Sequence, residues 1–95
     1  MKTVYKYKLG DAGGTVLMPY GANIVHVGYQ HNDVLTIWAE VDTEEIRYID
    51  RSFAVYGTGW PITAERAVML ATLLVNNGEY VWHVYETTKS FPYGY

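Results

Sequence analysis

The sequence lacks cysteine, and this absence excludes several kinds of chemistry at once. Without cysteine the chain has no disulfide framework, no thiolate zinc site and no cysteine nucleophile, and its composition fits a reducing compartment such as the cytosol. Serine is almost as scarce, since Ser52 and Ser90 are the only two. Neither lies in a Gly-x-Ser-x-Gly turn. The sequence therefore gives little support to nucleophilic catalysis, and we expect no catalytic residue.

Long hydrophobic runs and a strong net charge are also missing. No apolar run approaches the about 18 residues of a transmembrane helix, and the first five residues do not resemble a signal peptide. Seven lysines and arginines against ten acidic residues give a formal net charge of −3. We therefore expect neither a membrane span nor secretion, and the small negative charge disfavours nucleic acid as a partner.

Histidines are few, and their spacing is not that of metal ligands. His26, His31 and His83 form neither a His-x-His nor a His-x-x-x-His pair. We expect no metal site and no cofactor. His83 differs from the others because it lies in the apolar segment 81–86, where a buried imidazole would need hydrogen-bond partners.

Aromatic side chains are abundant. The 95 residues are 49% hydrophobic and 16% aromatic, with ten tyrosines, so one hydrophobic core is within reach without disulfides. The length allows a single domain. We assign residues 1–86 to it and expect residues 87–95, with Pro92 and Gly94, to form a flexible C-terminal tail.

Short alternating segments separated by turn signals predict an antiparallel all-β fold. Lysines on segment 2–8 suit an edge strand, whereas segment 34–41 is apolar on both faces and suits a central strand. Asn77-Gly78 between apolar segments predicts a hairpin in which both turn residues have positive φ. The expected strands are Lys2–Lys8, Thr15–Met18, Asn23–Gln30, Val34–Val41, Ile46–Tyr56, Thr72–Val75 and Tyr80–Glu86.

Segment Thr63–Leu70 favours one short helix. Thr63 is a suitable N-cap, Glu65 would lie in the first turn, and the following residues have good helical propensity. The expected fold is therefore an antiparallel β-sandwich or flattened barrel of six or seven strands with one short helix.

The segment Gly57-Thr58-Gly59-Trp60 is the most distinctive candidate for a binding site. Its glycines permit positive φ and close approach of a ligand, and Trp60 offers a face for stacking. It is not a phosphate-binding loop, because the lysine of that pattern is missing. The alternative is a glycine-rich connection in which Trp60 closes one end of the core.

Four stretches of the sequence resemble a known pattern. They are Met18-Pro19-x-Gly21-Ala22-x-Ile24-x-His26-Val27-Gly28, Ile37-Trp38-Ala39-x-Val41-Asp42, Phe53-x-Val55-Tyr56-Gly57-Thr58-Gly59-x-Pro61-Ile62 and Val81-Trp82-His83-Val84-Tyr85-Glu86. From Lys2 to Glu86 the chain resembles a family of small uncharacterised proteins found largely in bacteriophage and prophage genomes.

The resemblance implies a viral protein of the host cytoplasm that acts against host defence. One route is sequestration of a nucleotide-derived immune signal, with rings against the base. The other is inhibition of a host defence effector, of the anti-CRISPR or anti-restriction type, through an exposed aromatic patch or strand edge. A virion accessory role is a third alternative. The residues expected to bind the ligand are Tyr56, Gly57, Thr58, Gly59, Trp60, Arg51 and His83.

We expect a non-enzymatic binding protein, with sequestration as the first hypothesis. Seven basic residues are few for an anionic ligand. The open strand edges of a small β domain also favour a homo-oligomer.

Overall fold

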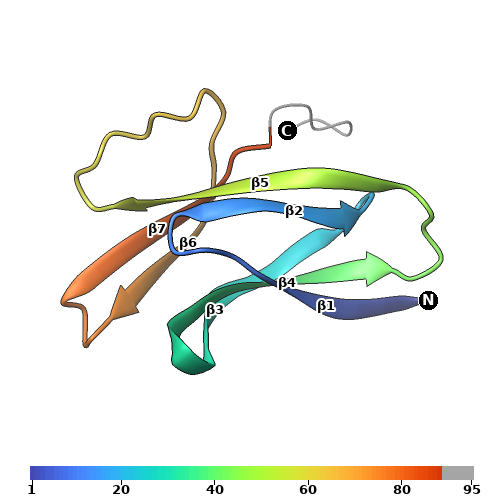
Figure 1. The fold of residues 1–95 in the computed structure, drawn as a ribbon, viewed down its shortest axis with the longest axis horizontal. Helices are drawn as coiled ribbons and strands as arrows, with labels where there is room; N and C mark the ends of the chain where they lie inside the picture. Colours follow the sequence, from blue (N-terminus) through green and yellow to red (C-terminus); the bar gives the residue numbers. More distant parts are fainter. Residues whose placement is uncertain (89–95) are drawn as a thin grey trace.

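The computed structural model describes residues 1–88. These residues form seven antiparallel strands in two sheets (Figure 1). A 3₁₀ turn at His31–Asp33 joins the third strand to the fourth. The strands are β1 (Lys2–Lys8), β2 (Gly13–Pro19), β3 (Asn23–Gln30), β4 (Val34–Asp42), β5 (Tyr48–Gly57), β6 (Val68–Val75) and β7 (Tyr80–Glu86). The prediction of an antiparallel β-sandwich is confirmed.

The two sheets have the strand orders β1-β4-β3 and β2-β5-β7-β6. As predicted, β4 is central and the lysine-bearing β1 lies at an edge. Leu35, Ile37 and Ala39 of β4 point into the core and have at most 1% of their surface exposed. Phe53 and Val84 of the second sheet are also part of the core. Burying each large apolar side chain contributes about 1.5–3 kcal/mol, so this interface holds the sheets together.

One ion pair lies inside the sandwich. Arg51 on β5 donates from Nε and Nη2 to the two carboxylate oxygens of Glu86 on β7, each at 2.7 Å. Its Nη1 donates to the carbonyl of Ala22, which precedes β3. Arg51 is 4% exposed and Glu86 is 1% exposed. This bidentate contact ties β5 to β7 and to the connection between the sheets.

The predicted helix at Thr63–Leu70 is wrong. Residues 61–67 form an irregular connection, and β6 begins at Val68. A helix of two turns is marginal in water, because nucleation is costly. Pairing with Tyr85 and Glu86 of β7 instead satisfies the backbone and packs Leu70 against the core.

The hairpin between β6 and β7 forms as predicted. The Glu79 amide donates to the Asn76 carbonyl at 3.1 Å, and the central residues Asn77 and Gly78 have φ of 56° and 88°. Asparagine and glycine tolerate this conformation better than other residues, which explains their use here.

Of the predicted C-terminal tail, residues 87–95, the structure describes Thr87 and Thr88. The Thr87 amide donates to the Ser52 carbonyl at 2.7 Å, and Thr88 Oγ1 accepts from the Ser52 amide at 2.9 Å. The remainder of that segment, residues 89–95, lies outside the described residues. Within residues 1–88 there is no helix long and apolar enough to cross a membrane.

Candidate functional site

The glycine-rich segment forms a tight turn at the end of β5. The Trp60 amide donates to the Gly57 carbonyl at 3.0 Å, and Gly59 has φ of 86°. A Cβ on Gly57 would lie 2.8 Å from Cε2 of Trp60. Glycine at this position therefore allows the indole to rest on the backbone. The indole packs on the backbone of its own turn, and 56% of the Trp60 surface stays exposed. The alternative, in which Trp60 closes one end of the core, stays a prediction.

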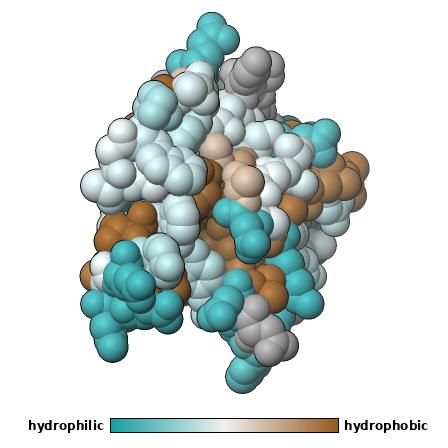
Figure 2. Space-filling model, turned by 60° about the vertical axis from the view of Figure 1, so that its left-hand side comes forward, coloured by the Kyte–Doolittle hydropathy of each residue, from teal (hydrophilic) through white to brown (hydrophobic). Residues whose placement is uncertain are grey.

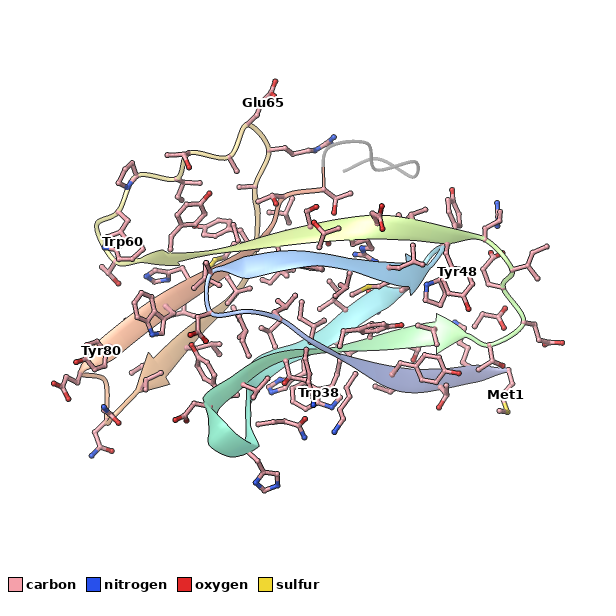
Figure 3. All side chains as sticks on the ribbon, viewed as in Figure 1. Met1, Trp38, Tyr48, Trp60, Glu65 and Tyr80 are labelled. Carbon is pink, nitrogen blue, oxygen red and sulfur yellow. The ribbon has the colours of Figure 1, made fainter. Side chains whose placement is uncertain are left out.

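Trp60 belongs to a group of aromatic rings at one end of the molecule. Its ring centroid lies 5.7 Å from that of Trp82, with the planes at 75°. Trp82 also stacks on Tyr80, with centroids 6.5 Å apart and planes at 8°. Figure 3 shows Trp60 and Tyr80 at the same end, opposite Met1. Together with Tyr29 we call these residues the aromatic end: Tyr29, Trp60, Tyr80 and Trp82.

Three hollows meet at Trp60. The first lies between the two sheets, has a volume of about 240 Å³ and is lined by Asp11, Ala12, Tyr29, Val55, Trp60 and Trp82. The second, of about 160 Å³, is lined by Tyr56, Gly57, Thr58, Gly59, Trp60, Ile62, His83 and Tyr85. The third, of about 420 Å³, is lined by Gly57, Thr58, Trp60, Glu79, Tyr80, Val81 and Trp82. On this side of the molecule, hydrophobic residues show in gaps between hydrophilic ones (Figure 2).

The structure therefore brings six of the seven expected site residues together. His83 is fixed by both ring nitrogens, since Nε2 lies 2.8 Å from Thr58 Oγ1 and Nδ1 lies 3.0 Å from Thr72 Oγ1. Tyr56 is fixed by an edge contact with Tyr85, with centroids 5.8 Å apart. These contacts supply the partners that an imidazole on this strand needs. Both side chains line the second hollow, and these contacts restrict their rotamers.

Arg51 lies elsewhere. It points from β5 into the sandwich and bonds to Glu86, whereas Tyr56 and His83 lie on the outer face of the same sheet. Sequence analysis placed it at the site because an arginine suits an anionic ligand. Because side chains alternate along a strand, Arg51 and Tyr56 of β5 lie on opposite faces of the sheet.

Sequence analysis did not place Asp11, Glu79 and Trp82 at the site. Trp82 lies opposite Gly57 in the pairing of β5 with β7, whereas the predicted hairpin pairs it with Leu73 of β6. The sequence has no turn signal for the β5–β7 register, so it did not place Trp82 at the site. Asp11 and Glu79 have no local signal either, because both lie in turns distant from Trp60 in sequence. Their carboxylates place negative charge on the walls of the first and third hollows. Burial raises the pKa of the Tyr29 hydroxyl, and the charges of Asp11 and Asp33 raise it further.

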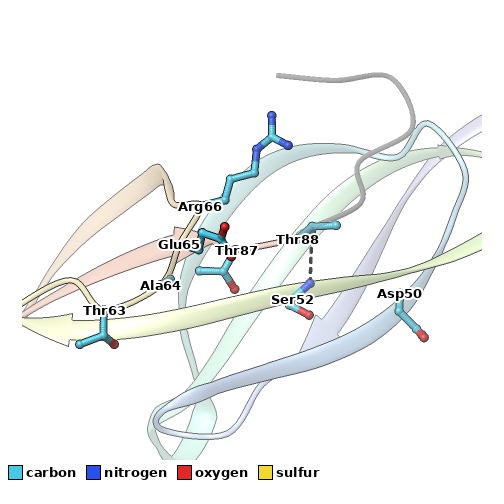
Figure 4. Close-up of a pocket in the computed structure, with 8 residues that line it drawn as sticks. All are labelled: Asp50, Ser52, Thr63, Ala64, Glu65, Arg66, Thr87 and Thr88. Atoms are coloured by element: carbon cyan, nitrogen blue, oxygen red, sulfur yellow. Dashed lines mark hydrogen bonds between the residues drawn. The ribbon is translucent and has the colours of Figure 1, made fainter.

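A larger hollow than these three lies elsewhere, under the connection 61–67. It has a volume of about 560 Å³ and is lined by Asp50, Ser52, Thr63, Ala64, Glu65, Arg66, Thr87 and Thr88 (Figure 4). The described part of the chain ends at its rim. We therefore do not assign it a ligand. Across residues 1–88, no three histidine, aspartate or glutamate side chains gather in a way that could hold a metal ion.

Comparison with known proteins assigns the chain to a family. The model of a domain of unknown function, DUF7352, matches residues 1–93. The chain belongs to the DUF7352 family. No curated protein and no solved structure matches it. The match supports the expected membership of a small uncharacterised family and transfers no site residue, so the site rests on the geometry alone.

Proposed function

We propose that this protein is a non-enzymatic binding protein that holds another protein at its aromatic end. The observation that supports this is the convergence of three hollows on one half-exposed tryptophan. Tryptophan and tyrosine are enriched in binding interfaces because they bury large areas and lose little conformational entropy. The rings are also held in place by one another before binding, which lowers the entropic cost of association.

The charge of this end favours a protein partner over a phosphorylated ligand. Asp11 lines the first hollow and Glu79 lines the third. Phosphates are normally held by arginine, lysine or backbone amides, and carboxylates repel them. The sequence resemblance to phage proteins supports a host defence effector as that partner. Inhibition of such an effector in the host cytoplasm therefore takes precedence over sequestration of a nucleotide signal.

Sequestration remains the second candidate for one reason. The third hollow, at about 420 Å³, falls within the usual range of small-molecule pockets, about 300–1,000 Å³, and its rings could stack on a base. A nucleotide would then have to place its phosphates away from Glu79.

We also propose that the protein forms a homodimer through β6. This strand is an edge of its sheet, contains no charged residue or proline, and exposes Met69 and Leu74. Among the other edges, β1 carries three lysines and β2 contains Pro19, and both features hinder pairing with a further strand. β3 and β6 each have one bulge, near Val25 and Leu70, so the bulges do not distinguish these two edges. An uncharged edge of eight residues can pair with a second copy across a two-fold axis.

The binding proposal is tested by affinity capture from host cells, followed by calorimetry with each purified captured protein. We expect a protein that binds the wild type and loses at least about tenfold in affinity with Trp60→Ala, as for an interface hot spot. The matched control is Tyr48→Ala, because Tyr48 is equally exposed at the opposite end (Figure 3).

Equal binding by Trp60→Ala would refute the assignment of this site. A thermal shift with cyclic dinucleotides or ADP-ribose derivatives that Trp60→Ala abolishes would instead favour the nucleotide candidate.

A further inference from the structure

The first hollow has the wall arrangement of an aromatic cage. Trp60 and Trp82 meet with their ring planes at 75° and their centroids 5.7 Å apart, so they form two nearly perpendicular walls. Tyr29 from the other sheet also lines the hollow, and Val55 contributes an apolar surface. Aromatic faces attract a cation through the negative potential above the ring.

The hollow also carries a negative charge. Among its lining residues Asp11 is the one with a charged side chain. Burial raises the pKa of Tyr29, and the negative charges of Asp11 and Asp33 raise it further, as expected for carboxylates close to this wall. A cation entering the hollow gains from the rings and from the carboxylate together.

The chain holds these groups in fixed positions. Asp11 and Ala12 are the central residues of a turn closed by two backbone hydrogen bonds, from Gly10 to Gly13 at 3.2 Å and from Gly13 to Gly10 at 3.0 Å. Gly13 packs so closely on Phe53 of β5 that a Cβ would lie 2.2 Å from its carbonyl oxygen. The acidic turn is therefore anchored to the same strand that leads to Trp60.

We infer that the hollow between Asp11, Tyr29, Trp60 and Trp82 is a binding site for an organic ammonium group. At about 240 Å³ the hollow takes a group of a few heavy atoms rather than a whole nucleotide. The inference rests on the proposed function and specifies it: the bound group is an ammonium-bearing side chain of the protein partner, a lysine or an N-methylated amine.

The test uses choline as the ammonium probe and 3,3-dimethylbutan-1-ol as its neutral counterpart of similar shape. Tryptophan fluorescence and calorimetry follow each titration of the full chain. We expect choline to bind in the millimolar range and the alcohol to bind at least about fivefold more weakly, the ratio given by an exposed cation–π contact of about 1 kcal/mol. Asp11→Asn should weaken choline binding by a similar factor and leave the alcohol unchanged. Asp50→Asn, an exposed carboxylate outside this hollow, is the matched control.

Equal binding of choline and the alcohol, or choline binding unaffected by Asp11→Asn and Trp60→Ala, would overturn the ammonium site. The proposed function would survive that result if a captured protein still required Trp60. Loss of both the choline site and the Trp60-dependent partner would refute the two together.

Discussion

At the scale of single residues, Arg51 and Glu86 show how burial decides a role. Both charges are almost fully buried, and their cost of desolvation is offset only while they remain paired. Each has further bonds, Arg51 to the Ala22 carbonyl and Glu86 from the Thr88 hydroxyl at 2.9 Å. The pair therefore belongs to the stability of the fold rather than to a ligand site.

We predict that Arg51→Met destabilises the protein by about 3–5 kcal/mol, because it leaves the Glu86 carboxylate buried without its main partner. The double variant Arg51→Met with Glu86→Leu should recover a large part of this loss. Urea unfolding of the single and double variants measures the coupling. Additive effects of the two substitutions would contradict the account.

A second prediction concerns the pKa of Glu45, which forms an ion pair with Arg47 in the connection before β5. Hydrogen bonds from the Arg47 side chain and backbone lower the pKa of Glu45 from 4.5 to about 2. The contact therefore contributes its full stabilising free energy to the folded state above pH 4.5, and this contribution is lost as the pH falls toward about 2. Carboxyl NMR titration should find Glu45 ionised at pH 3 in the wild type. Arg47→Met should return its pKa toward the ordinary value, and an unchanged midpoint would rule out this cause.

At the scale of elements, the alternation of side chains predicted the strands well where the pairing is regular. The boundaries of β1, β3 and β7 agree with those expected from the sequence. Strict alternation would place Ile24 and Val27 on opposite faces of β3. A bulge near Val25 shifts the alternation, so the two side chains lie on the same face. A bulge depends on the partner strand, so the sequence of β3 alone does not predict it.

Long-range contacts explain the other departures. The apolar start of β6 has helical propensity, and only its pairing with β7 makes it a strand. The glycine-rich segment was found from its own residues, since Gly57 and Trp60 interact locally. Asp11, Tyr29 and Glu79 join it from other parts of the chain, and local patterns do not carry that information.

The turn that holds Asp11 gives a prediction at this scale. Gly13 has φ of 104° and no room for a Cβ against Phe53. Gly13→Ala should therefore destabilise the protein by at least about 2 kcal/mol. Gly14→Ala is the control, because its φ is also positive but no atom lies within 4 Å of the added Cβ. If thermal unfolding shows the same loss of stability for both variants, a steric clash at Gly13 is not the cause.

At the scale of the whole molecule, the edge strand β6 determines the predicted assembly. Leu74→Lys would place like charges near each other in a β6–β6 pair and remove apolar contact. We expect the dimer dissociation constant to rise at least about tenfold, measured by analytical ultracentrifugation. Leu17→Lys, on the opposite edge of the same sheet and similarly exposed, should leave the dimer intact. A wild type that remains monomeric at all concentrations would refute the dimer.

The central claim is that the aromatic end binds a partner's cationic group, and the three tryptophans allow a direct test of it. Trp60 and Trp82 line the first hollow, whereas Trp38 lies on the other sheet beside His26, with ring centroids 5.3 Å apart. The measurement is the indole N–H spectrum by NMR during titration with choline. The account predicts that the signals of Trp60 and Trp82 move together and saturate while that of Trp38 stays in place. A titration in which all three signals move alike, or in which none moves, would contradict it.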